Sequence, residues 1–302
     1  MSPVAPAALS LHQALAEVGA EIDRRFDALL AVPDDARARL YQAMRHAAIG
    51  GGKRLRPLLV FAVADMFRVN RDCTAAVATA IECIHVYSLI HDDLPAMDDD
   101  DTRRGKPTVH KAFDEATAIL AGDSLHALAF EILGEATAHA DPLVRAELVV
   151  ELARASGAAG MAGGQMMDLV AETTRFDLAT VTRLQALKTG ALIAFSVEAG
   201  AILGHAGPEA RTSLRGYARD IGLAFQIADD ILDVEGDEET VGKKLGKDGD
   251  AGKETFLSLL GLYRAREQAR MLVEQSIAHL HAFGPEADLL REIARFVLER
   301  DR

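Results

Sequence analysis

Apolar residues recur at three- and four-residue spacing along most of the chain, with polar residues between them. This spacing is typical of helices that turn an apolar face toward a core. Runs in which polar and apolar residues alternate between turn signals, as strands would require, are missing from the sequence. The pattern therefore predicts an all-α protein.

Residues that favour the starts and ends of helices punctuate this pattern. Asp114 and Asp177 precede apolar runs, where a carboxylate can accept hydrogen bonds from the first backbone N–H groups of a helix. Pro208 and Pro285 suit a first helical turn, and Gly204 suits a helix end. We expect helices to begin and end at these positions.

Two long segments are apolar around most of their circumference. They are residues 176–207 and 213–234, and helices of this kind lie inside a large bundle. No linker, low-complexity tract or fixed-period repeat divides the chain, so we expect residues 1–302 to form a single domain. The Gly- and charge-rich stretch 236–253 follows the second segment, and we expect it to form a lid.

Composition and charge narrow the possible partners. The 302 residues are 49% hydrophobic and 26% charged, as in ordinary globular proteins, and the formal net charge is −13. A surplus of acidic residues argues against general binding to nucleic acid or anionic membranes. Two cysteines, no signal-like N-terminus and no uninterrupted apolar run of ~18 residues predict a cytoplasmic protein without membrane insertion.

One acidic cluster carries its carboxylates on a single predicted helix face. In FQIADDILD, Gln226, Asp229, Asp230 and Asp233 follow i, i+3, i+4 and i+7 spacing. A solvated helix face is the plainer interpretation, but such a face normally mixes charges of both signs, because like charges at these spacings repel. Hard Mg²⁺ prefers carboxylate oxygens together with substrate phosphates, so a metal site is the competing interpretation.

A second cluster lies earlier, in HDDLPAMDDDDTRRG. On a continuous helix Asp98 would point away from Asp92. Pro95 disfavours helix at the preceding residue, so the chain can unwind there and bring the two aspartates together. A calcium loop starting at Asp98 is excluded, because Arg103 stands where that loop needs glycine.

Basic residues accompany both clusters in this otherwise acidic chain. Arg103 and Arg104 follow the first cluster at once, and GGKRLRP places Lys53, Arg54 and Arg56 after a glycine turn. Arginine binds phosphate oxygens with two parallel hydrogen bonds, and lysine provides a point charge. We therefore expect two diphosphate groups to be held by these side chains and by magnesium.

Taken together, these motifs resemble those of the short-chain trans-prenyl diphosphate synthase family, and the resemblance covers nearly the whole chain. The motifs that carry it occur in the family's order: GGKRLRP (51–57), DDxxxxD with RR (92–104), GMxxGQxxD (160–168), KTG (188–190), FQxxDDxxD (225–233) and GK (242–243). The resemblance implies one helical bundle of the isoprenoid synthase type around an apolar cavity. It also implies Mg²⁺ as cofactor, three ions with the bound diphosphate, and a homodimer, for which the apolar segment 114–133 is a candidate interface.

The resemblance also assigns roles to individual residues. Those implied to hold isopentenyl diphosphate are Lys53, Arg56, His85 and Arg104. Those implied to ligate magnesium are Asp92, Asp98, Asp229 and Asp233. The allylic diphosphate or the developing cation would be contacted by Arg103, Lys188, Thr189, Gln226, Lys243 and Lys253, with Lys244 and Lys247 as less certain members of the lid. The implied catalytic set is Asp92, Asp98, Arg103, Lys188, Gln226, Asp229 and Lys243.

In this family, magnesium and basic groups stabilise the departing diphosphate, and isopentenyl diphosphate attacks the resulting allylic cation. The released diphosphate takes the proton lost from the new bond, so no dedicated side-chain base is required. The family limits product length with the residues four and five positions before the first aspartate, here Ser88 and Tyr87. A bulky tyrosine at this position favours farnesyl diphosphate made from dimethylallyl and geranyl diphosphates.

Other interpretations remain for the sequence. A geranylgeranyl or geranyl diphosphate synthase would differ only in pocket depth. A class I terpene cyclase also uses two acidic motifs but binds one diphosphate and does not need GGKRLRP. A noncatalytic regulatory subunit of a heteromeric synthase would be expected to carry an eroded acidic motif, and both motifs are intact here.

Overall fold

The computed structural model describes residues 10–235 and 253–299, and it confirms the all-α prediction. The helices are α1 (Leu11–Leu29), α2 (Ala38–Ala48), α3 (Leu55–Met66), α4 (Arg71–Asp92), α5 (Val109–Ala112), α6 (Glu115–Gly134), α7 (Pro142–Ser156), α8 (Met161–Ala171), α9 (Leu178–Gln185), α10 (Ala191–Leu203), α11 (Pro208–Glu235), α14 (Phe256–Leu260), α15 (Leu262–His279) and α16 (Asp288–Glu299). A π-helical turn, η1 (Ala186–Gly190), joins α9 to α10, and a short 3₁₀ turn, η2 (Pro285–Ala287), precedes α16. Within the described residues, strand structure is limited to a two-stranded antiparallel hairpin, β1 (Thr102–Arg103) with β2 (Lys106–Pro107).

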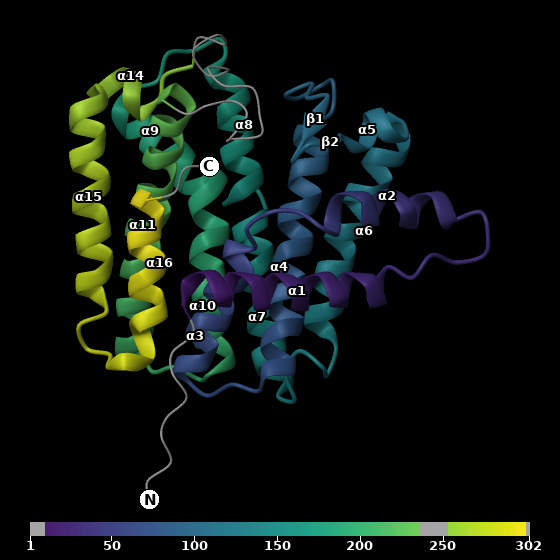
Figure 1. The fold of residues 1–302 in the computed structure, drawn as a ribbon, viewed down its shortest axis with the longest axis horizontal. Coiled ribbons are helices and arrows are strands. Elements are labelled where there is room, and N and C mark those ends of the chain that lie inside the picture. Colours follow the sequence, from purple (N-terminus) through teal and green to yellow (C-terminus); the bar gives the residue numbers. More distant parts are fainter. Residues whose placement is uncertain (1–9, 236–252, 300–302) are drawn as a thin grey trace, which may run out of the picture.

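The long helices form one bundle. In Figure 1, α4, α10 and α11 run through its middle, while α15 and α16 cover one flank and α1 crosses in front. The most extensive helix contacts join α11 to α15, α4 to α6 and α10 to α3. Helices far apart in the sequence therefore share one core.

The predicted helix starts agree with the structure. Asp114 and Asp177 are the N-caps of α6 and α9, and each accepts a hydrogen bond from a backbone N–H three residues on. Pro208 is the first residue of α11, Pro285 begins η2, and Gly204 is the C-cap of α10. These local signals are sufficient to locate the helix ends, because each one acts within a single helical turn.

Two central helices are buried on all sides over much of their length. Every residue from 74 to 84 in α4 and from 195 to 203 in α10 is buried. Burial of this kind stabilises a fold by roughly 25 cal/mol for each Å² of apolar surface removed from water. The sequence prediction of all-round apolar helices inside the bundle is confirmed for the segment containing α10.

Three helical segments are long and apolar enough to cross a membrane by length and composition alone. They are Arg71–Asp92, Glu115–Gly134 and Leu178–Leu203, although none is an uninterrupted apolar run. The buried shares of their most apolar windows are 72%, 39% and 61%, respectively. The bundle thus covers most of the first and third, whereas α6 keeps an exposed apolar face that includes Ile119 and Leu120.

Candidate active site

A cavity of about 1490 Å³ opens between the central helices. Its walls come from α1, α3, α4, α8, η1, α10, α11 and α16. Predicted site residues in its lining are Lys53, Arg56, His85, Tyr87, Ser88, Asp92, Arg104, Lys188, Thr189 and Asp229. One cavity therefore brings together residues from most of the motifs found in the sequence.

The first acidic cluster turns back on itself at the end of α4. The helix ends at Asp92, and the backbone N–H of Asp98 donates to the carbonyl oxygen of Asp92 at 2.8 Å. Burial raises the pKa of Asp92 to about 6, and the carboxylate of Asp98 adds to this rise, while Lys188 opposes it. The unwinding expected at Pro95 thus occurs, and it brings Asp98 within electrostatic range of Asp92.

The second acidic cluster lies within α11, but its carboxylates do not share one environment. Asp229 lines the cavity. Asp230 is 5% exposed and accepts hydrogen bonds from the backbone N–H of Phe256 at 2.8 Å and from Gln226 Nε2 at 3.3 Å. Asp233 is half-buried one turn further along α11. Spacing alone predicted that all three carboxylates share one helix face. In the structure, Asp230 instead points to α14 and accepts the backbone N–H of its first residue, Phe256.

A basic pocket occupies the part of the cavity between α3, α4 and the β1–β2 hairpin. Lys53, Arg56, His85 and Arg104 all line it. Burial and the surrounding arginines lower the pKa of His85 well below 6.5, so its imidazole is neutral. Arg104 Nη2 lies 3.5 Å from His85 Nε2, and since a guanidinium can only donate, this nitrogen is the acceptor.

Two buried polar atoms of the cavity lining have no hydrogen-bond partner among the described residues. They are Arg56 Nε and Gln165 Nε2. Burying a donor without a partner costs about 1–3 kcal/mol, so such atoms mark places where a ligand can bind. Both are donors, which suits the oxygen atoms of a diphosphate.

Arg54 corrects one expectation from the sequence, which grouped it with the anion-binding residues of GGKRLRP. Its side chain is 2% exposed and is engaged by Glu82 at 2.6 Å and Asp23 at 2.7 Å. It also donates to the carbonyl oxygen of Ala48 at 2.6 Å and holds a left-handed backbone, with φ of 53°. Arg54 therefore fixes the junction between the loop that carries Lys53 and the start of α3, which carries Arg56.

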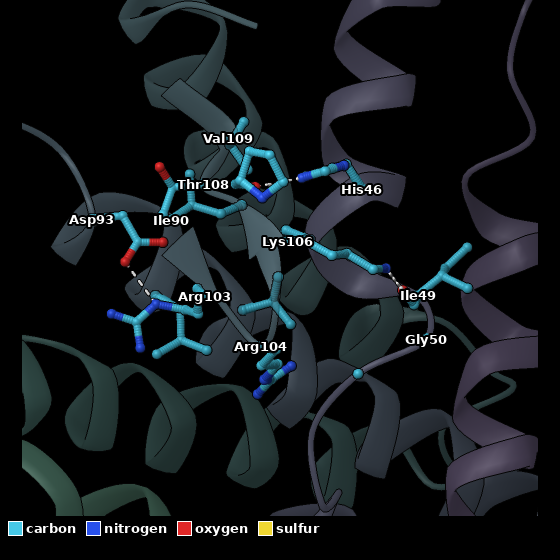
Figure 2. Close-up of a pocket in the computed structure, with 15 residues that line it drawn as sticks. His46, Ile49, Gly50, Ile90, Asp93, Arg103, Arg104, Lys106, Thr108 and Val109 are labelled. Atoms are coloured by element: carbon cyan, nitrogen blue, oxygen red, sulfur yellow. Dashed lines mark hydrogen bonds and ion pairs between the residues drawn. The ribbon is translucent and has the colours of Figure 1, made fainter. Parts of the chain in front are cut away.

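Arg103 is held at the edge of a second, smaller pocket of about 40 Å³ (Figure 2). Its Nε donates to the buried carboxylate of Asp93 at 2.6 Å. Lys106 Nζ and the carbonyl oxygen of Ile49, 3.3 Å apart, close another side of this pocket. Arg104 lines both pockets, whereas Arg103 faces the smaller one, so contact between Arg103 and an allylic diphosphate stays a prediction.

Two lysines, Lys188 in η1 and Lys253 just before α14, meet at the carboxylate of Asp168. Lys188 Nζ and Lys253 Nζ each lie 2.9 Å from the same oxygen of Asp168. Burial raises the pKa of Asp168, but the two lysines outweigh it and hold this pKa below its ordinary value. A Cβ at Gly164 would lie 2.2 Å from the backbone nitrogen of Lys188, so only glycine lets α8 approach η1 this closely.

Thr189 lines the cavity beside Lys188, and Gln226 of α11 holds its hydroxyl from behind the lining. The hydroxyl of Thr189 donates to Gln226 Oε1 at 3.1 Å. A π-helical turn accommodates one more residue than an α-helical turn, and such turns often occur at functional sites. The turn at η1 displays consecutive residues, Lys188 and Thr189, to the same cavity.

The far end of the cavity is aromatic. The ring of Tyr87 packs edge-on against His91 at 5.7 Å and against His126 of α6 at 5.0 Å, measured between ring centroids. Ser88 lines the cavity beside it and donates to the carbonyl oxygen of His85 at 2.9 Å. Tyr87 therefore places an aromatic ring in the cavity lining along α4.

Several site residues were not singled out from the sequence. They are Glu82, Gln165 and Asp168. Glu82 stands three residues before His85 on α4, and Gln165 and Asp168 belong to the quoted GMxxGQxxD motif, so spacing held a signal for these three. Lys243, Lys244, Lys247 and nearly all of the expected lid lie outside the described residues.

The donor set fits a divalent cation, although no cluster of three ligating side chains occurs within the described residues. Asp92 and Asp229 line the same cavity, and Asp98 lies close to Asp92. Mg²⁺ commonly takes one or two carboxylates and completes its shell with water and substrate phosphates. Asp92 on one wall and Asp229 on the other could therefore each share a cation with a bound phosphate.

The cavity sets carboxylates of α4 and α11 against a pocket of basic side chains, an arrangement suited to binding diphosphates together with a divalent cation. A family model described as Polyprenyl synthetase matches residues 37–290, and the chain belongs to this family. It is 49% identical over 266 residues to farnesyl diphosphate synthase of Escherichia coli K12, covering 86% of this chain and 89% of that one.

Solved structures give the same result. An apo FPP/GFPP synthase from Zymomonas mobilis matches with a TM-score of 0.88 and 59% identity, over 95% of this chain and 98% of that one. A geranyltransferase from Helicobacter pylori, complexed with magnesium and isoprenyl diphosphate, matches with a TM-score of 0.81 and 34% identity, over 99% and 98% of the two chains. The predicted family and its isoprenoid synthase fold are therefore confirmed.

Proposed function

We propose that this protein is a prenyltransferase that condenses isopentenyl diphosphate with dimethylallyl and geranyl diphosphates to give farnesyl diphosphate. The observation that carries the proposal is that one cavity is lined both by a basic pocket and by a carboxylate from each acidic motif, Asp92 and Asp229. A cyclase with one diphosphate substrate has no use for the pocket around Arg56. Relatives named as farnesyl diphosphate synthases support the same activity.

The basic pocket holds the isopentenyl diphosphate in this proposal. Lys53 and Arg104 supply charge, and the buried Nε of Arg56 gains the acceptor that it lacks. Neutral His85 can serve as a hydrogen-bond partner without adding a further buried charge. The diphosphate is thereby fixed so that its apolar tail points into the cavity.

The opposite side of the cavity holds the allylic diphosphate. Lys188 and Lys253 converge there, and Asp92, Asp98, Asp229 and Asp233 would hold about three Mg²⁺ ions together with the diphosphate. Magnesium supplies charge stabilisation for the departing diphosphate. Thr189, held by Gln226, presents its hydroxyl oxygen toward the carbon that becomes positive, and the surrounding apolar helices exclude water from it.

Tyr87 sets the C15 product length in this proposal, since its ring closes the cavity along α4. A geranylgeranyl diphosphate synthase is the second candidate, because relatives with that name are 42–44% identical to this chain. The FPP/GFPP synthase from Zymomonas mobilis is a further reason to measure product length directly.

We also infer a cytoplasmic homodimer. Support comes from the exposed apolar face of α6, where Ile119 and Leu120 are 45% and 55% exposed. A second copy of the chain would cover this face. Light scattering after gel filtration tests it: Leu120→Lys is expected to shift a dimer toward monomer, and a wild type that runs as a monomer contradicts the inference.

The function itself is tested with purified protein, Mg²⁺, isopentenyl diphosphate and dimethylallyl diphosphate. We expect release of pyrophosphate, a C15 product by chromatography, and loss of both in EDTA. A longer or shorter product would assign one of the related synthases instead. Absence of pyrophosphate release would favour a regulatory subunit and sink the enzyme proposal.

A further inference from the structure

A carboxylate lies inside the basic pocket. Glu82 is 1% exposed and belongs to the cavity lining, and its Oε1 accepts a hydrogen bond from Arg54 Nη1 at 2.6 Å. Arg54 is equally buried and has Asp23 and the carbonyl oxygen of Ala48 as further partners. Arg54 would thus keep an acidic partner in Asp23 without Glu82, and Glu82 is more than its structural counterion.

The charge of Glu82 also reaches the side chains that face the diphosphate. Burial lowers the pKa of Arg56, and Glu82 is the strongest opposing influence on it, ahead of Asp229. Desolvation likewise lowers the pKa of Arg104, again with Glu82 as the strongest opposing group. Asp23, in contrast, is not among the described groups that act on Arg56.

A bound diphosphate would compete with this carboxylate for the same positive charge. Arg56 Nε is buried with no partner among the described residues, so the anion is drawn deep into the pocket, toward the charges that Glu82 already balances. The repulsion between the carboxylate of Glu82 and the phosphate oxygens is only partly screened in a buried pocket. The repulsion is therefore large enough to change diphosphate affinity measurably.

We propose that Glu82 is a permanent internal counter-anion of the isopentenyl diphosphate pocket. It balances the buried arginines when no diphosphate is bound, and it keeps diphosphate affinity below the value that the basic side chains alone would give. The proposal rests on the function assigned above to this pocket. A moderate affinity for diphosphate suits this pocket, because the diphosphate of each newly extended chain must leave it before another isopentenyl diphosphate can enter.

The test is calorimetric titration of the full-length protein with isopentenyl diphosphate in EDTA, where the basic pocket alone can hold it. Glu82→Gln keeps the size of the side chain and an oxygen acceptor for Arg54 but removes the charge. We expect this variant to bind about tenfold more tightly, because one repulsive buried charge has been removed. In turnover, its KM for isopentenyl diphosphate should fall more than its KM for geranyl diphosphate.

Asp23→Asn is the matched control, because it weakens the other acidic partner of Arg54. We expect it to lower thermal stability without tightening the binding of isopentenyl diphosphate. If Glu82 served only to anchor Arg54, both variants would bind more weakly. Unchanged or weaker binding by Glu82→Gln therefore overturns the proposal, as does equal tightening by Asp23→Asn.

If Glu82→Gln does not fold, the same charge can be removed in an Arg54→Gln background, where Glu82 no longer has the buried guanidinium of Arg54 as its hydrogen-bond partner. We expect Arg54→Gln alone to bind isopentenyl diphosphate more weakly than wild type. Addition of Glu82→Gln should then restore affinity by about tenfold. A double variant that binds no better than Arg54→Gln overturns the proposal.

These outcomes are separate from those that test the enzymatic function. A wild type that releases pyrophosphate, with a Glu82→Gln variant that binds no more tightly, removes the counter-anion role and leaves the enzyme intact. A wild type that binds no isopentenyl diphosphate and releases no pyrophosphate removes both.

Discussion

The backbone N–H of Asp98 donates to the carbonyl oxygen of Asp92 over 2.8 Å, which closes a turn after the end of α4. The turn brings two carboxylates close together that a continuous helix would separate. Burial raises the pKa of Asp92 to about 6, and the nearby carboxylate of Asp98 adds to this rise, because both oppose a further negative charge there. Asp229 lines the same cavity from α11, so the two halves of the site face one another through the cavity.

The adjacent aspartates of α11 are expected to respond differently to substitution. Asp229→Asn should lower kcat/KM by about 100-fold or more, equivalent to about 3 kcal/mol of transition-state stabilisation, with little change in stability. Asp230→Ala should lower the unfolding free energy by about 1–3 kcal/mol, because the buried N–H of Phe256 loses its acceptor. Steady-state kinetics and urea denaturation measure both quantities, and similar profiles for the two variants would contradict the separation of roles.

Tyr87 is expected to control product length. Tyr87→Ala removes the ring that packs against His126, and the ratio of longer products to C15 should rise by about tenfold or more, since apolar pockets discriminate between neighbouring chain lengths by 1–3 kcal/mol. Tyr87→Phe keeps the ring and serves as the control, with an unchanged product distribution. Chromatography of the dephosphorylated products decides the matter, and an unchanged distribution in Tyr87→Ala removes Tyr87 as the end wall.

The pH dependence of stability should contain a contribution from Asp168. Its folded-state pKa lies below the ordinary 3.8, because Lys188 and Lys253 outweigh the effect of burial. The stabilisation is therefore fully present above the unfolded pKa and is lost as pH falls through the folded one. The stability gap between wild type and Asp168→Asn should be constant near neutral pH and narrow below about pH 4. Urea denaturation across this range measures the gap. A gap that stays constant to pH 2 would show that Lys188 and Lys253 do not stabilise the Asp168 carboxylate.

Gly164 should be irreplaceable where α8 meets the π-helical turn. In Gly164→Ala the new Cβ would lie 2.2 Å from the backbone nitrogen of Lys188, so one of the two segments must move. We expect a loss of about 1–3 kcal/mol in unfolding free energy, as for other overpacked sites, and a fall in kcat because Lys188 is displaced.

Gly134 provides the matched control, since a Cβ there meets nothing within 4 Å among the described residues. Gly134→Ala should change stability by no more than about 1 kcal/mol, in the stabilising direction, and leave kcat unaffected. Equal effects of the two substitutions would show that the close contact at Lys188 has no special importance.

The parts of this molecule that follow from the sequence are those determined locally. Asp114 and Asp177 cap helices through contacts three residues away, and Pro95 ends α4 through its own backbone chemistry. The motifs shared with the family then predicted many of the residues that line the cavity, because the order and spacing of these motifs are specific to one family.

The remaining relationships depend on packing between distant segments. The ion pair of Arg54 with Glu82 spans 28 residues, and the contact of Lys253 with Asp168 spans 85. Helical spacing put Asp230 beside Asp229, but only the position of α14 shows that the carboxylate of Asp230 is already occupied by a backbone N–H. No local pattern contains the orientation of one helix against another.

The all-round burial of α10 has a consequence for synthesis. Its residues 195–203 face other helices on every side, and α11, which covers part of that surface, is translated after it. As α10 emerges from the ribosome, an apolar segment as hydrophobic as a membrane span is therefore exposed before its coverage is complete. Chaperone binding to the nascent chain should be strongest in this interval, and release should follow translation of α11.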